Sequence, residues 1–78
     1  MDHNTFDIEL DCRGLNCPLP ILKTKKTMDG MVTGQVLKML STDPGSKNDL
    51  TAWAGKTDNE ILILKNDGKD FVFYIRKG

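Results

Sequence analysis

The residues best suited to chemistry are a cysteine and the prolines after it, in the run Cys17-Pro18-Leu19-Pro20. Proline pushes the preceding residue toward extended backbone, and proline itself suits the first position of a helix. The sequence therefore predicts Cys17 as the N-cap of a helix that begins at Pro18. A thiol there faces the positive end of the helix dipole, which favours the nucleophilic thiolate.

Few backbone N–H groups are expected to donate a hydrogen bond to that sulfur atom. An N-cap side chain accepts a hydrogen bond from the N–H of the second or third helical residue. Because Pro20 has no N–H, Leu19 is the one such donor left. Arg13 is expected to lower the thiol pKa further and Asp11 to oppose it, so that the pKa lies below the value of about 8.5 for free cysteine. Gly14 provides the turn that leads into the motif.

The second cysteine, Cys12, continues an apolar face. Phe6, Ile8, Leu10 and Cys12 alternate with acidic residues, which is typical of a half-buried strand. Cys12 is therefore interpreted as a core residue. The alternative is a redox pair, in which Cys12 resolves an oxidised Cys17 and the two Cα atoms lie within about 7 Å. Two cysteines and one histidine do not suffice for a closed zinc site, so no metal is expected.

The remaining pattern alternates strands and helices. Strands are predicted over 6–12, 35–42, 60–64 and 71–76, with a hairpin loop over 65–70. Helices are predicted over 18–28, with Ile21, Leu22, Lys25 and Met28 inward, and from an N-cap at Ser46 to about Gly55. The order β-α-β-α-β-β predicts an α/β (α+β) two-layer sandwich whose first two strands are parallel and whose helices share one face.

This topology brings two loops to one edge of the sheet. Ligands collect at the carboxyl ends of parallel strands, and the predicted first and second strands end at the loops 12–17 and 42–45. Asp43 in the second loop is interpreted as a turn former or a partner contact. The uncovered face of the sheet is expected to carry an apolar patch. Its candidate residues are Val36, Leu40, Leu62, Val72 and Tyr74.

Composition narrows the class of protein. The 78 residues suit a single domain over 1–78. Eleven basic and eleven acidic residues cancel, which argues against a nucleic-acid partner bound through phosphate charge. The sequence has no long apolar segment and no secretory pattern, so a cytoplasmic protein without a membrane partner is expected.

The motif and its setting resemble the TusA/SirA-like sulfur carriers. The resemblance rests on Asp11-Cys12-Arg13-Gly14 followed by Cys17-Pro18-Leu19-Pro20, and it extends to Gly34, Thr42-Asp43-Pro44, Asp49, Trp53 and the closing residues 74–78. It implies a four-stranded mixed sheet with two helices on one face and the last strand antiparallel to the others. Leu19 stands where some relatives carry an acidic residue, and residues 56–59 lack a histidine that many relatives have.

The resemblance also implies a function. Cys17 would hold sulfane sulfur as a persulfide, without a separate cofactor, after transfer from a cysteine desulfurase or a rhodanese-like donor. An acceptor protein, in tRNA thiolation or another sulfur-trafficking pathway, would take the sulfur on. Lys23, Lys25 and Lys26 lie within two helical turns of Cys17 and are expected to meet the partners. The alternatives are a two-cysteine redox protein and an RNA-binding module, the latter by fold similarity alone.

Overall fold

A computed structural model describes residues 6–16 and 18–78 of the chain. Its elements follow the predicted order β-α-β-α-β-β. They are β1 (Ile8–Cys12), α1 (Leu19–Asp29), β2 (Val36–Ser41), α2 (Ser46–Gly55), β3 (Glu60–Asp67) and β4 (Asp70–Arg76).

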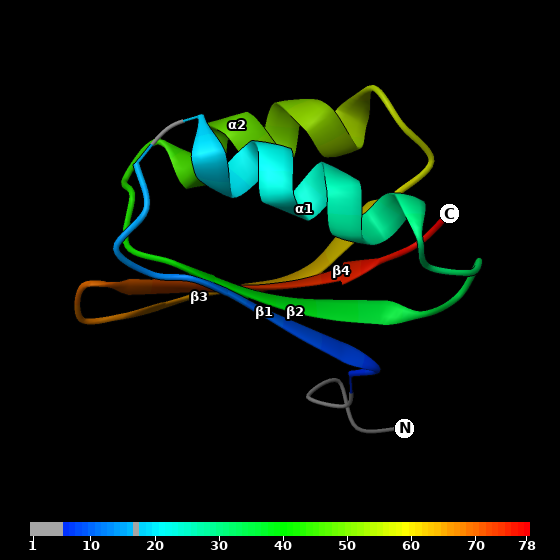
Figure 1. Cartoon of the computed structure of the whole chain (residues 1–78), viewed down its shortest axis with the longest axis horizontal. Helices are drawn as coiled ribbons and strands as arrows, with labels where there is room; N and C mark the ends of the chain where they lie inside the picture. The colour runs from blue at the N-terminus through cyan, green and yellow to red at the C-terminus, as the bar shows by residue number, and fades with distance from the viewer. Residues whose placement is uncertain (1–5, 17) are drawn as a thin grey trace.

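The four strands form one mixed sheet in the order β1-β2-β4-β3. β1 runs parallel to β2, with Ile8 opposite Leu37 and Cys12 opposite Ser41. β4 lies antiparallel to both of its neighbours, β2 and β3. Both helices cover the same face of this sheet (Figure 1). The predicted two-layer α/β sandwich is confirmed.

The core lies between the helices and the sheet. In β2 the burial alternates residue by residue, so that Leu37, Met39 and Ser41 point into the core. Phe73 and Ile75 of β4 add to it from the neighbouring strand. Each large apolar side chain removed from water in this way contributes about 1.5–3 kcal/mol to folding. The helices are thus held on the sheet mainly by burial.

The face that α1 buries agrees with the prediction at Ile21 and Met28 but not at Leu22 and Lys25, which are exposed. Pro20, Thr24 and Met28 are buried, whereas the side chain of Leu22, predicted to point inward, is 52% exposed. A helix turns by about 100° per residue, so Leu22 lies about 200° around the axis from Pro20. The hydroxyl of Thr24 donates a hydrogen bond of 2.8 Å to the carbonyl of Pro20. A polar residue can therefore occupy the buried stripe, and an apolar one is left in solvent.

The opposite face of the sheet, called here the open face, exposes its apolar residues less than predicted. Tyr74 is only 5% exposed. The ring of Phe6 lies 6.3 Å from it, and Lys65 Nζ lies 5.8 Å from its ring centroid. Val36, Leu40 and Val72 are half-buried, and Leu62 is 36% exposed beside a β-bulge. Tyr74 therefore does not contribute to an exposed apolar patch as expected, because it is buried, with Phe6 and Lys65 against its ring.

The β3–β4 hairpin is longer and its turn tighter than predicted. Asp67 pairs with Asp70, which leaves only Gly68 and Lys69 in the loop. Gly68 has a φ of +64°. A positive φ at the first central position is what a type II′ hairpin turn requires.

Candidate functional site

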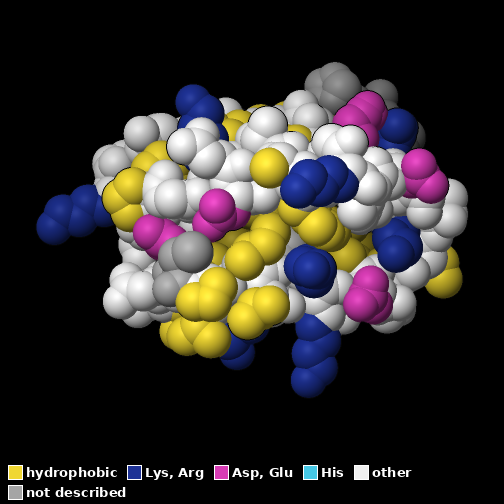
Figure 2. Space-filling model, turned by 90° about the horizontal axis from the view of Figure 1, so that it is seen from above, with side chains coloured by type: hydrophobic (Ala, Val, Ile, Leu, Met, Phe, Trp, Pro, Cys, Tyr) yellow, Lys and Arg dark blue, Asp and Glu magenta, His cyan; other side chains and the backbone are white. Residues whose placement is uncertain are grey.

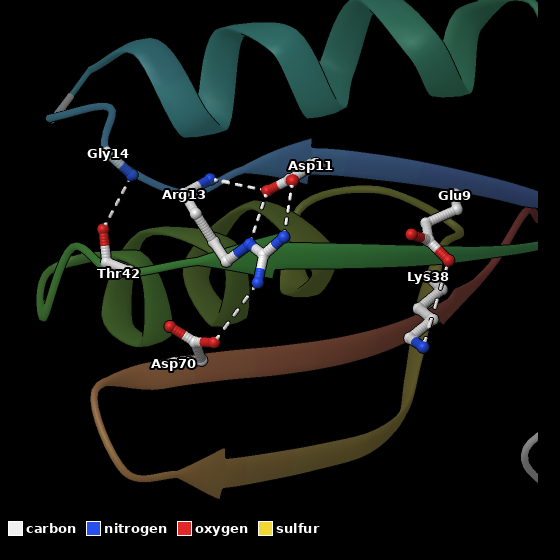
Figure 3. Close-up of polar contacts among 7 residues, drawn as sticks. All are labelled: Glu9, Asp11, Arg13, Gly14, Lys38, Thr42 and Asp70. Carbon is white, nitrogen blue, oxygen red and sulfur yellow. Dashed lines mark hydrogen bonds and ion pairs between the residues drawn. The ribbon is translucent and has the colours of Figure 1, made fainter.

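The loops that follow β1 and β2 meet at one edge of the sheet, as predicted. The backbone N–H of Gly14 donates a 2.9 Å hydrogen bond to Thr42 Oγ1 (Figure 3). Gly14 has a φ of +83°, a conformation that favours glycine. Glycine is therefore favoured here by the backbone conformation and not by close packing, since a Cβ atom would meet nothing within 4 Å.

Arg13 ties the same loop to the rest of the sheet. Its Nε and Nη2 atoms donate 2.9 Å hydrogen bonds to the two carboxylate oxygens of Asp11, and its Nη1 lies 3.6 Å from Asp70 Oδ2 (Figure 3). The guanidinium lowers the pKa of the Asp11 carboxyl to about 2, and the carboxylate raises the pKa of Arg13. Arg13 and Asp11 were predicted to shift the thiol pKa in opposite directions. Their charges are joined in one ion pair.

The start of α1 is displaced by one residue from the prediction. Pro18 is the N-cap, with φ −97° and ψ 12°, and Leu19 is the first helical residue. The N–H of Leu22 donates a 3.1 Å hydrogen bond to the Pro18 carbonyl. The N–H of Leu19, expected to be the donor left for the sulfur, donates instead to the Asn16 carbonyl at 2.9 Å. The predicted N-cap itself, Cys17, lies outside the described residues.

The residues next to Cys17 in sequence are exposed and largely apolar. Pro18 is exposed, and the side chains of Leu19 and Leu22 are 45% and 52% exposed. Three exposed lysines follow on the same helix: Lys23, Lys25 and Lys26. The predicted lysine set is therefore accessible. Leu22, which was predicted to point inward, is an exposed apolar side chain of the same helix.

Asp43 shapes the turn between β2 and α2. Its Oδ1 accepts a 3.2 Å hydrogen bond from the N–H of Gly45, and its carbonyl accepts one of 3.0 Å from Ser46 N. Its Oδ2 is buried and has no hydrogen-bond partner in the part of the chain that the structure describes. These bonds agree with the turn-forming interpretation of Asp43. They leave its suggested contact with a partner as a prediction.

Ser46 is not the N-cap of α2, which is Gly45. The Oγ atom of Ser46 lies 2.6 Å from Ser41 Oγ in the core, and Ser41 Oγ also accepts a hydrogen bond from Asp43 N at 3.1 Å. The predicted capping hydroxyl is thus drawn inward, where it satisfies a buried polar group of the sheet.

Cys12 is fully buried in the core cluster, which confirms its interpretation as a core residue. Burial raises the pKa of its thiol, and the Asp11 charge acts in the same direction, while Lys23 acts against both. A thiol in this setting is a poor nucleophile because the charged form is disfavoured and access is blocked.

Neither a metal centre nor a membrane-spanning helix is found within residues 6–16 and 18–78. No three His, Cys, Asp or Glu side chains gather there where they could hold a metal ion. No helix among them is long and apolar enough to cross a membrane.

Comparison with known proteins identifies the family. Residues 8–77 match the family model described as Sulfurtransferase TusA. The chain belongs to the TusA family. It is 54% identical over 72 residues to the sulfur carrier protein TusA of Allochromatium vinosum, covering 92% of this chain and 95% of that one. It is 44% identical to the putative sulfur carrier protein YrkI of Bacillus subtilis, covering 92% and 96% of the two chains.

The TusA-family fold is also found in a solved structure. The crystal structure of the SirA-like protein from Desulfitobacterium hafniense superposes with a TM-score of 0.78 at 25% identity, covering 92% of this chain and 99% of that one. The resemblance inferred from the Cys-Pro motif and its setting is confirmed at the level of family and fold.

Proposed function

We propose that this protein is a sulfur carrier that accepts sulfane sulfur as a persulfide on Cys17 and passes it to a partner protein. The observation that carries the proposal is the family match, since it spans the motif and includes relatives named sulfur carriers. The position of the motif in the fold supports it. The segment 13–16 leads from the carboxyl end of β1 into the first turn of α1, at the edge where β2 also ends.

The proposed transfer is a thiol exchange on sulfur. The Cys17 thiolate attacks the outer sulfur of the donor persulfide, a new S–S bond forms, and the donor leaves as its thiolate. The acceptor thiolate then attacks the outer sulfur on Cys17, which returns to the thiolate. The start of α1 favours the anionic form of Cys17 in both steps. No separate cofactor is needed, because the sulfur is carried covalently.

The proposed partners are a cysteine desulfurase or a rhodanese-like protein as donor, and a downstream protein as acceptor in tRNA thiolation or another sulfur-trafficking pathway. The exposed Leu19 and Leu22 offer apolar contact beside the motif. Lys23, Lys25, Lys26 and Asp43 are the proposed polar contacts. Charges at the rim of an interface mainly set the rate of encounter and its salt dependence. We propose that the carrier works in the cytoplasm without a membrane or nucleic-acid partner.

The test is an intact-mass measurement after incubation with a desulfurase and cysteine. The parent and Cys12→Ala are expected to gain the mass of one sulfur atom, and Cys17→Ser is expected to gain none. Circular dichroism shows whether each variant is folded. A retained gain in Cys17→Ser would overturn the assignment of the carrier residue. Loss of the gain in a folded Cys12→Ala would favour the two-cysteine redox alternative, which the burial of Cys12 opposes.

A further inference from the structure

A groove of about 390 Å³ runs along the surface between α1 and α2. Its apolar lining includes Ile21 of α1 and Ala52 and Trp53 of α2. Seen from above the helices, hydrophobic side chains lie along this surface with Lys and Arg side chains among them (Figure 2). The volume lies at the lower end of the range for pockets that bind small molecules.

The charged part of the lining is suited to carboxylates. Lys25 of α1 and Lys56, which follows α2, both line the groove. Neither lysine forms an ion pair with any carboxylate of the described residues. The carboxylate of Asp49 also belongs to the lining. A ligand with two carboxylates matches the two lysines.

The groove also reaches the residue that follows the proposed sulfur acceptor in the sequence. Pro18 belongs to its lining, and Pro18 is bonded directly to Cys17. We infer that the groove binds a low-molecular-weight thiol persulfide that carries carboxylates, and that this compound loads Cys17 without a protein donor. The inference rests on the proposed function, because it needs Cys17 to be the sulfur acceptor.

The loading step balances without any further reactant. The Cys17 thiolate attacks the outer sulfur of R–S–SH, and an S–S bond forms between them. The bond between that sulfur and R–S breaks, its electron pair leaves with R–S⁻, and the proton stays on the transferred sulfur. The net change is the exchange of one S–S bond for another. Lys25 and Lys56 hold the carboxylates of R, which makes them positioning residues for this step.

The first experiment measures binding apart from chemistry. Trp53 is the one tryptophan of the chain and lines the groove, so its fluorescence reports occupancy. In the Cys17→Ser background, which has no thiol at the motif, titration with reduced glutathione is expected to give a saturable change. Lys25→Ala/Lys56→Ala in that background is expected to raise the half-saturating concentration roughly fivefold to tenfold, because two exposed ion pairs are lost.

The matched control is Lys47→Ala/Lys69→Ala, which removes the same charge from exposed sites outside the groove lining. This variant is expected to bind as the Cys17→Ser protein does. Glutathione diethyl ester, which lacks the carboxylates, is expected to bind weakly to all three proteins. An unsaturable titration, or equal binding of acid and ester, would overturn the inference.

The second experiment measures loading by intact mass with glutathione persulfide as the sole donor. The rate for the protein with Cys17 is expected to saturate with persulfide concentration, and the lysine pair variant is expected to require a higher concentration. A strictly linear dependence would show that the small donor reacts without a site. If a desulfurase loads the protein and glutathione persulfide does so only linearly, the inference fails alone. If neither donor loads Cys17, the proposed function fails as well.

Discussion

The two faces of the sheet are built from alternate residues of the same strands, yet different forces shape them. On the helix-covered face Leu37 and Met39 of β2 are completely buried. On the open face their neighbours Lys38 and Leu40 are half-buried, and Lys38 Nζ lies 3.9 Å from Glu9 Oε1. The covered face therefore derives more of its stability from burial than the open face does, whereas the loop edge depends on polar contacts and turn geometry. We expect their responses to mutation to differ accordingly.

The largest expected difference comes from one pair of leucines in β2. Leu37→Ala should lower the free energy of unfolding by about 2–5 kcal/mol, because it leaves a cavity in the core. Leu40→Ala removes the same atoms from the half-buried open face and should cost about half as much or less. Urea unfolding followed by circular dichroism gives both values. Equal losses for the two variants would show that the faces are equally packed.

A smaller effect is expected at the loop edge, where chain geometry decides. Gly14→Ala should cost about 1–2 kcal/mol, because an alanine at φ +83° adopts the disfavoured left-handed region. The matched control is Gly55→Ala at the end of α2, where φ is not positive and a Cβ atom meets nothing within 4 Å. This control should stabilise the protein slightly. A neutral Gly14→Ala would mean that the loop tolerates another path.

The ion pair at that edge predicts a pH dependence. The pKa of Asp11 is lowered from 3.8 to about 2 in the folded protein. Its contribution to stability is therefore present above pH 3.8 and is lost as the pH falls toward 2. Asp11→Asn and Arg13→Gln should each show a shallower loss of melting temperature between pH 4 and pH 2 than the parent. A parent-like slope in both variants would contradict the lowered pKa.

The smallest effect on stability is expected on the outer surface of α1. Lys23→Glu/Lys26→Glu should change the free energy of unfolding by less than about 1 kcal/mol, because exposed charges contribute little. The same variant should slow sulfur acceptance from a protein donor at low salt, since charges steer encounter. Lys47→Glu/Lys69→Glu is the charge-matched control. If both variants load at the parental rate, the lysines of α1 have no part in docking.

Local pattern in the sequence was enough to predict the elements. The alternation of apolar and acidic residues predicted β1, because a strand has a period of two. The predicted ends of both helices, at residue 28 and at about Gly55, agree with the structure within one residue. The Cys-Pro motif and its setting predicted the family.

Tertiary contacts decided what local pattern could not. Leu22, predicted to point inward, is exposed, because the orientation of α1 on the sheet depends on the whole interface. Thr24 is buried instead, and its hydroxyl is satisfied within the helix. The hydroxyl of Ser46 pairs with that of Ser41 in the core, so Ser46 does not cap α2 as predicted.

The partners of Arg13 and the shape of the site also came from the tertiary structure. Arg13 forms ion pairs with Asp11, two residues away, and with Asp70, which is distant in the sequence. The groove between α1 and α2 exists only when both helices lie on the sheet. The sequence determined by itself which residue types are available and in what local conformation. The packing of elements distant in sequence determined which of them are exposed, paired or brought together, because burial and ion pairing depend on neighbours in space.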